Sequence, residues 1–178
     1  LVTGVQTCAL PICERSGAGA AQADLFVDHW TVLTPSNDTD PEALDTVHRL
    51  WRGVGAQVRV MEPETHDRIL GMTSHLPHAT AYALVAQLAQ QANKEECFEM
   101  AAGGFLDLTR IASSDPVMWR DIFLDNRDAL VQLIDQHLET LAALREHVHR
   151  GDGPALTSWF EDARDLRDRL VRTRSRKS

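Results

Sequence analysis

Residues 103–112 read GGFLDLTRIA, and residues 114–121 follow with SDPVMWRD. Paired glycines let a backbone approach another group closely, and Arg110 comes after them in a largely apolar setting. A guanidinium in such a setting requires an anionic partner, because an unpaired buried charge is costly. Asp115-Pro116 then signals the start of a helix. The stretch therefore predicts the wall of a pocket for a carboxylate or a phosphate, followed by a long helix.

The sequence on both sides of this stretch has the apolar spacing of helices from Pro63 onward. Pro77 is expected to kink or break the helix that contains it, and residues 93–99 are a polar connection or a short helix. Asp115-Pro116 is predicted to open the longest helix, and a last helix follows the turn at residues 151–154. The apolar stripe of the long helix runs through Ile122, Asn126, Leu130, Leu133, Ile134, His137, Leu138, Leu141, Leu144 and Val148. That of the last helix runs through Leu156, Phe160, Ala163, Leu166 and Leu170.

Before Pro63 the pattern is that of an α/β unit. The expected elements are a strand over residues 30–33, a helix with Asp40 as its N-cap and Pro41 at its first position, and a strand over residues 57–61. A strand, a helix and a strand in this order predict the end of an α/β domain.

Composition limits the classes of function. The 178 residues carry a formal net charge of −8, which argues against non-specific binding of nucleic acid. No apolar run reaches the ~20 residues needed to span a membrane. The three cysteines form no Cys-x-x-Cys pair, so a reducing cytoplasm is the expected location.

Residues 1–13 (LVTGVQTCALPIC) fit poorly with the rest of the chain. They could pass for a short apolar strand, and they lack the basic segment with which a signal peptide begins. Residues 5–12 resemble the translation of a common sequencing adapter. We therefore expect residues 1–13 to be an artefact or disordered, joined to a truncated gene, and we leave them out of the fold prediction.

Histidines form a second candidate site. His66-Asp67 is followed by SHLPH over residues 74–78, where His75 and His78 share a helix face at i, i+3. A metal site with His66 or Asp67 as a further ligand is one interpretation, although the spacing is not that of a typical zinc motif. The alternative is that these histidines are ordinary core or surface residues.

Two more residues have both a structural and a functional interpretation. Arg110 either pairs on the surface with Asp107 or holds a carboxylate through its planar guanidinium. Trp119 either anchors the start of the long helix or is an exposed aromatic residue at a subunit interface. Nucleotide binding is not supported by the residues present, because Gly17-Ala18-Gly19 has no third glycine at the required spacing and no strand before it.

Together these segments resemble the prephenate/arogenate dehydrogenase family, which includes bacterial cyclohexadienyl dehydrogenases. The likeness covers residues 14 to about 170, and the SHLPH and GGFxDxTRIA motifs are specific in combination. The matching segments, in the family's order and spacing, are residues 14–17, 23–26, 32–35, 66–68, 74–78, 103–112 and 114–123.

The resemblance implies a mainly α chain. Residues 14–61 would be the strand-helix-strand remnant of an NAD(P)-binding Rossmann domain, and residues 62–178 a helical domain that binds substrate and dimerises. The implied reaction is the oxidative decarboxylation of prephenate to 4-hydroxyphenylpyruvate in tyrosine biosynthesis, with NAD or NADP as cofactor, in a cytoplasmic homodimer. Arogenate is the alternative substrate.

The resemblance also implies a set of substrate-binding residues. Arg110 would hold a substrate carboxylate, and His78 would line the same pocket near the pyruvyl side chain. Two members of the set would reach the site of a neighbouring subunit, namely Asp67 and Trp119. The full set is Arg110, His78, Gly103, Gly104, Glu14, Asp67 and Trp119.

The chain departs from the family pattern in two respects. The glycine-rich dinucleotide fingerprint is missing, and Cys8 stands where the family has its catalytic histidine, in a His-Pro-Ile-Ala-Gly segment upstream of Glu14. We therefore expect no catalytic residue, no NAD binding and no dehydrogenase activity in this chain by itself. Two rival hypotheses are a non-catalytic helical dimerisation or ligand-binding module, and a helical metal protein built on His66, His75 and His78.

Overall fold

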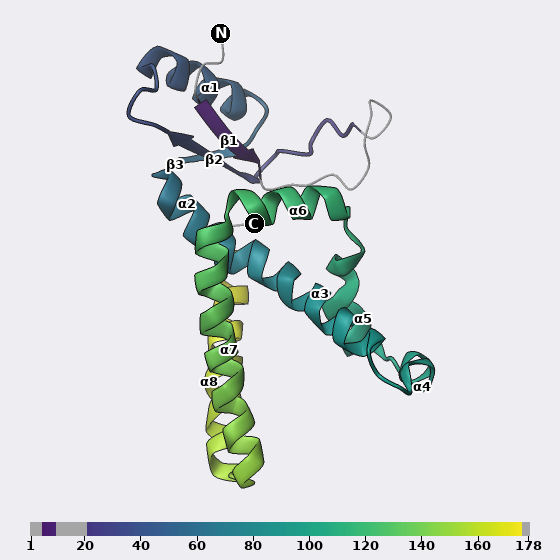
Figure 1. Cartoon of the computed structure of the whole chain (residues 1–178). Coiled ribbons are helices and arrows are strands. Elements are labelled where there is room, and N and C mark those ends of the chain that lie inside the picture. Colours follow the sequence, from purple (N-terminus) through teal and green to yellow (C-terminus); the bar gives the residue numbers. More distant parts are fainter. Residues whose placement is uncertain (1–4, 10–20, 176–178) are drawn as a thin grey trace. The chain divides into compact units, whose positions relative to one another are not determined.

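The computed structural model of the chain describes residues 5–9 and 21–175. The described part is mainly helical with one small sheet (Figure 1), as the sequence predicted. The chain separates into two compact units, Leu1–Val131 and Gln132–Ser178. The division into a Rossmann remnant and a helical domain at residues 61 and 62 stays a prediction.

The sheet has three strands in the order β1-β2-β3: β1 (Val5–Ala9), β2 (Trp30–Pro35) and β3 (Gln57–Val60). β1 lies antiparallel to β2, with Cys8 opposite Val32, and β3 lies parallel to β2. A strand therefore forms within residues 1–13, which we had left out of the fold prediction.

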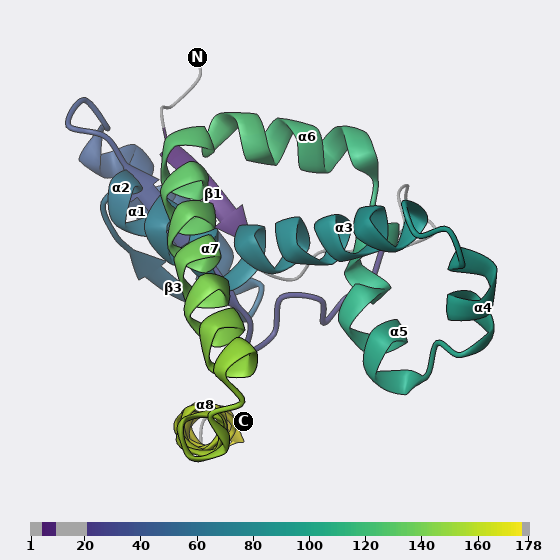
Figure 2. The same ribbon diagram turned by 60° about the horizontal axis from the view of Figure 1, so that its bottom comes forward.

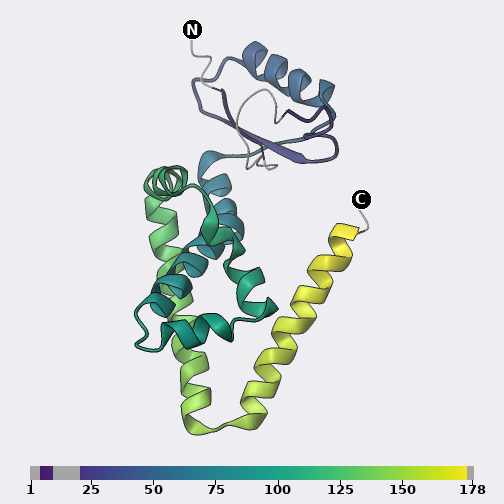
Figure 3. The same ribbon diagram turned by 90° about the vertical axis from the view of Figure 1, so that its right-hand side faces the viewer.

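Helix α1 (Pro41–Gly53) connects the two parallel strands and covers one face of the sheet (Figure 3). Asp40 caps it as predicted, because its carboxylate accepts a hydrogen bond from Glu42 N at 3.0 Å. Trp51 of α1 meets Phe26 edge to face at 5.0 Å between ring centroids. The core of this part is β2 itself, in which Thr31, Val32, Leu33 and Thr34 are all buried.

Gly55 forms the turn between α1 and β3. Its φ of +87° is a left-handed conformation that side chains rarely adopt, and an added Cβ would lie 3.0 Å from Val27 Cγ2. The Gly55 carbonyl oxygen also accepts a hydrogen bond from Asp28 N at 3.0 Å. The turn thereby joins β3 to the segment that leads into β2.

From Pro63 onward the described residues contain helices only. They are α2 (Pro63–Leu70), the π-helical segment η2 (Gly71–His75), α3 (Leu76–Ala89), α4 (Lys94–Glu99), α5 (Gly103–Thr109), the 3₁₀ segment η3 (Arg110–Ser113), α6 (Pro116–Asp125), α7 (Arg127–Arg150) and α8 (Gly153–Ser175). The short helices α4 and α5 lie at the C-terminal end of α3 (Figure 2).

Pro77 was expected to kink or break its helix. It does not break it, because η2 joins α2 to α3 without interruption, but the helix changes from π to α at Leu76, next to Pro77. The predicted helix from Asp115 to Val148 is instead two helices, α6 and α7, because the backbone leaves the helical conformation at Asn126 (φ −104°, ψ 32°). No helix among the described residues is long and apolar enough to cross a membrane.

Candidate functional site

Three rings from α6, η2 and α3 meet inside the first unit, and we call His75, His78 and Trp119 the aromatic wall. Trp119 stacks on His78, with ring centroids 3.4 Å apart and an angle of 21° between the planes. His75 meets the same indole edge to face at 6.2 Å. Trp119 is only 3% exposed, which agrees with its interpretation as an anchor at the start of the helix, and its place at a subunit interface stays a prediction.

A π-helical segment ends at the first of the two histidines. η2 spans Gly71–His75 and ends where α3 begins, so His75 lies at the junction and His78 lies one turn further along. Single π-helical turns inside α-helices are rare and occur frequently at functional sites. Both rings consequently reach the same buried indole from one continuous helix.

His78 is held in one tautomer by the backbone. Its Nδ1 lies 2.9 Å from the Ser74 carbonyl oxygen, which can only accept, so Nδ1 carries the proton and Nε2 has the lone pair when the ring is neutral. Burial lowers the pKa of His78; the hydrogen bond to Ser74 opposes this, and the nearby Arg110 charge lowers the pKa further. The ring is therefore neutral at neutral pH.

Asn126 lies at the break between α6 and α7 and is 8% exposed. Its side-chain Nδ2 is 2.9 Å from the Asp67 carbonyl oxygen and 2.9 Å from His75 Nδ1. Burial lowers the pKa of His75, and the neighbouring His66 contributes in the same direction. Asn126 thus connects α2, η2 and the start of α7.

Asp67 takes part in this network from α2. Its carboxylate oxygen lies 2.9 Å from His66 Nδ1, in a pair whose side chains are 17% exposed for His66 and 47% for Asp67. Its backbone carbonyl accepts the hydrogen bond from Asn126. Asp67 is therefore beside His75 of its own chain, and its predicted role at a neighbouring subunit's site stays a prediction, as does that of Trp119.

Arg110 opens η3, which packs against α3. The expectation of a buried guanidinium is wrong, because Arg110 is exposed. Its charge nevertheless acts on His78, so the cation and the aromatic wall are close enough to interact. Tyr82 on α3 donates a hydrogen bond to the Ser114 carbonyl oxygen at 3.1 Å, which connects α3 to the start of α6.

The paired glycines begin α5 rather than a tight turn. Gly103 and Gly104 are both exposed, and an added Cβ on either would meet nothing described within 4 Å. Close approach of their backbone to a ligand stays a prediction. Glu14 and Gly17-Ala18-Gly19 lie outside the residues that the structure describes.

The N-terminus of α1 does not fit the pyrophosphate of a dinucleotide. In the strand-helix-strand unit, the helix N-terminus that follows β2 is the place where a pyrophosphate would be held by free amides. In α1 that end is occupied by the Asp40 carboxylate, Pro41 has no amide hydrogen, and Glu42 adds a second negative charge. A pyrophosphate would be repelled there, so no step of chemistry is assigned to NAD(P) in this part of the chain.

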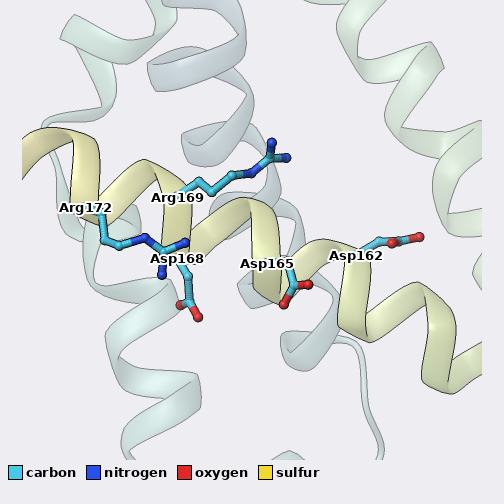
Figure 4. A pocket seen from close by; sticks show the side chains of 5 residues that line it. All are labelled: Asp162, Asp165, Asp168, Arg169 and Arg172. Carbon is cyan, nitrogen blue, oxygen red and sulfur yellow. The ribbon is translucent and has the colours of Figure 1, made fainter.

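A metal centre is not supported either. Within residues 5–9 and 21–175, no three His, Cys, Asp or Glu side chains are arranged to hold a metal ion. A shallow hollow on α8 is lined by Asp162, Asp165, Asp168, Arg169 and Arg172, and these side chains extend away from one helix without converging (Figure 4). It is the solvated charged face of a helix.

Sequence reasoning brought His75, His78, Arg110 and Trp119 to attention but missed Asn126, which it placed in an apolar stripe. The signal was available: an amide interrupting an apolar stripe is favoured at a helix end, where its side chain can bond to backbone groups.

Comparison with known proteins agrees with the resemblance. The family model described as the prephenate dehydrogenase nucleotide-binding domain matches residues 7–60, and the one described as the prephenate dehydrogenase dimerization domain matches residues 62–162. Prephenate dehydrogenase of Bacillus subtilis is 39% identical over 88% of this chain and 43% of its own length. Cyclohexadienyl dehydrogenase of Zymomonas mobilis is 35% identical over 86% of this chain and 53% of its own length.

Comparison with solved structures also agrees with the resemblance. Prephenate dehydrogenase from Aquifex aeolicus matches 93% of this chain and 59% of that chain, with a TM-score of 0.86 and 36% identity. Another structure of that enzyme, in complex with hydroxyphenyl propionate and NAD+, matches with a TM-score of 0.84 and 38% identity. The chain spans about half the length of the curated relatives it matches. From these matches and the motifs they contain, the chain belongs to the prephenate dehydrogenase family.

Proposed function

We propose that this chain is part of an enzyme that oxidatively decarboxylates prephenate to 4-hydroxyphenylpyruvate with NAD or NADP, and that its helices supply the substrate wall. The observation that carries the proposal is the aromatic wall beside a cation: Trp119 stacked on His78 at 3.4 Å, with the Arg110 charge acting on the same histidine. An aromatic surface next to a guanidinium matches a ring that bears carboxylates.

The proposed roles of these residues in substrate binding follow from their charge and shape. A guanidinium binds a carboxylate through two parallel hydrogen bonds, so Arg110 takes a carboxylate of the substrate. A neutral His78 carries no charge that would compete with Arg110 for the carboxylate. Trp119 is 3% exposed and stacks on His78, so it supports the His78 ring rather than contacting the substrate. Gly103 and Gly104 lie on the same side of Arg110 in sequence, at an uncrowded helix start that a ligand can approach.

We also propose that the chain works as a homodimer. The match to a family dimerization domain over residues 62–162 supports this. So does the apolar stripe of α7 and α8, which includes Leu141 at 46% and Phe160 at 57% exposure. A two-fold interface would use the same stripe on both subunits.

Binding of hydroxyphenyl propionate to this chain tests the substrate wall, because the Aquifex relative was solved with that molecule. We expect Arg110→Ala to weaken binding about ten- to hundred-fold, since a charge-assisted hydrogen bond contributes roughly 1.5–3 kcal/mol. Arg110→Lys should restore only part of the affinity, because an ammonium cannot form the paired bonds. Calorimetry measures all three constants.

Arg120→Ala is the matched control. Arg120 is also exposed and pairs with Asp121 at 2.7 Å on the surface of α6, so its loss should leave the affinity unchanged. Equal affinity in wild type and Arg110→Ala would remove Arg110 from the site. Titration with prephenate and with arogenate then distinguishes the two substrates. We expect no NAD reduction from this chain by itself.

A further inference from the structure

We propose that Asn126 is a positioning residue for the aromatic wall: its side-chain amide fixes His75 in the Nε2–H form and thereby keeps Trp119 against His78. The proposal rests on the function proposed above, because it concerns the surface to which the substrate would bind. Asn126 itself acts through His75 and not on the substrate.

The first step concerns the atoms. Asn126 Nδ2 lies 2.9 Å from two groups, the Asp67 carbonyl oxygen and His75 Nδ1. A carbonyl oxygen can only accept, so the atom facing Asp67 is the amide nitrogen and its two hydrogens serve the two partners. His75 Nδ1 must then accept, and the proton of the neutral ring is on Nε2.

The second step concerns charge. Protonated His75 would direct an N–H from Nδ1 at the amide hydrogens of Asn126, so two donors would face each other at 2.9 Å. The titratable groups acting on His75 are His66 and His78, which disfavour its charge, and Asp67, which favours it. Burial adds to the first two and lowers the pKa of His75. The network therefore favours a neutral ring.

The third step concerns Trp119. Within the described residues its buried indole Nε1 has no hydrogen-bond partner, so contacts with neighbouring rings hold its orientation. These rings are His78, His75 and Phe123, with centroids at 3.4, 6.2 and 5.8 Å. If His75 rotates or becomes charged, one of the three contacts that orient the indole changes.

Nitrogen-15 NMR of the full chain tests the proposal through His75 and the Trp119 indole. In wild type we expect the proton of His75 on Nε2. Asn126→Asp replaces the donor by a carboxylate, so His75 should carry a proton on Nδ1, its titration midpoint should rise, and the Trp119 indole resonance should shift. Affinity for hydroxyphenyl propionate should fall roughly fivefold, as for the loss of one orienting hydrogen bond, and should become dependent on pH.

Asn126→Ala is the second variant, because a carboxylate facing the Asp67 carbonyl could unfold the chain. It removes the donor without adding charge, so the titration midpoint of His75 should again rise. Asn93→Asp is the control: Asn93 is exposed, and its side chain forms no capping hydrogen bond at α4, so the same chemical change should leave His75 and Trp119 as they are.

The outcomes separate the two proposals. A wild-type His75 with its proton on Nδ1, or unchanged His75 and Trp119 signals in both Asn126 variants, would overturn the positioning role. If the signals change as expected while wild type fails to bind the analogue, the positioning role stands and the proposed substrate wall is wrong. If the analogue binds equally to wild type and to both variants, Asn126 does not act on the substrate surface.

Discussion

The two compact units of the chain differ in what they bury. Up to Val131, apolar and aromatic side chains are enclosed, including Leu33, Trp119 and Leu130 at 0%, 3% and 3% exposure. From Gln132 onward, no residue whose exposure is described is buried. Leu138, Val148, Phe160 and Leu166 are each 57–61% exposed, although they recur at helical spacing.

The difference shows that the same apolar periodicity has two outcomes. A helix buries its apolar face when the chain provides another layer of structure for it to pack against. The first unit supplies layers of its own. Within the second unit, His147 of α7 meets Trp159 of α8 with ring centroids 5.8 Å apart, and the apolar side chains named above stay exposed. An apolar stripe of this kind is usually covered by another protein surface, which is why we propose a second copy of the chain.

Replacing Leu166 with Asp should have the largest effect. We expect wild type to scatter light as a particle of twice the 19.8 kDa chain mass, and the variant as a monomer. Burying one leucine contributes roughly 1.5–3 kcal/mol, two copies are lost in a two-fold interface, and the introduced carboxylates would have to be dehydrated.

Leu50→Asp is the matched control for that experiment, since Leu50 on α1 is 63% exposed against 61% for Leu166. It should leave the particle mass unchanged. A wild-type monomer at micromolar concentration would show that the exposed stripe is not a subunit interface.

A pair of alanine variants on α7 sharpens the comparison within one helix. Leu130→Ala empties a buried position and should cost about 2–5 kcal/mol of unfolding free energy. Leu138→Ala, at a position 58% exposed, should leave the stability of the monomer nearly unchanged and weaken only the dimer. Urea denaturation at several protein concentrations measures both effects. Equal losses that are independent of concentration would contradict the division at Val131.

Local sequence signals predicted the beginnings of elements well. Asp40-Pro41 and Asp115-Pro116 start helices as expected, and both aspartates accept capping hydrogen bonds. The histidine segment and Arg110 were also singled out. These successes share a cause, since caps, prolines and motifs act through neighbouring residues.

Tertiary contacts were harder to predict. The amide of Asn126 within the apolar stripe was a local signal for the end of α6, but its partners His75 and Asp67 lie 51 and 59 residues away and could not be read from it. For Arg110 and Trp119 the sequence left two interpretations open, and local pattern could not decide which side chain is enclosed. Apolar neighbours in sequence made Arg110 look buried, but whether a side chain is enclosed depends on which helices pack against it.

Lowering the pH should reduce the stability of the first unit more than that of the second. Burial holds the pKa values of His75 and His78 below their ordinary 6.5, so the unfolded chain binds more protons than the folded chain in the range just below pH 6.5. Stability contributed by the neutral rings is therefore present above that pH and is lost as the pH falls toward the folded-state values.

Hydrogen exchange at pH 7.5 and 5.5, corrected for the intrinsic rate, measures this effect helix by helix. Protection should fall in α3 and α6 more than in α8. His78→Gln should reduce the difference between the two pH values, whereas His149→Gln, at an exposed position, should not. An equal loss in α8 would mean that the pH acts on the whole chain and not through the aromatic wall.

Removing helix caps should give the smallest loss of stability. Because one cap lies in each unit, the two variants compare the units most directly. Asp115 accepts a hydrogen bond from Met118 N at 2.8 Å at the start of α6, and Asp152 accepts one from Ala155 N at 3.0 Å at the start of α8. Each Asp→Ala change should remove about 1 kcal/mol from its helix.

Because α6 carries the buried Trp119, Asp115→Ala should lower the free energy of global unfolding. Within a single chain, the described part of α8 has no buried residue to transmit the loss, so Asp152→Ala should increase exchange in its first turn and leave global unfolding unchanged. Global destabilisation by Asp152→Ala at concentrations where the chain is monomeric would show that α8 is part of the same cooperative unit as α6.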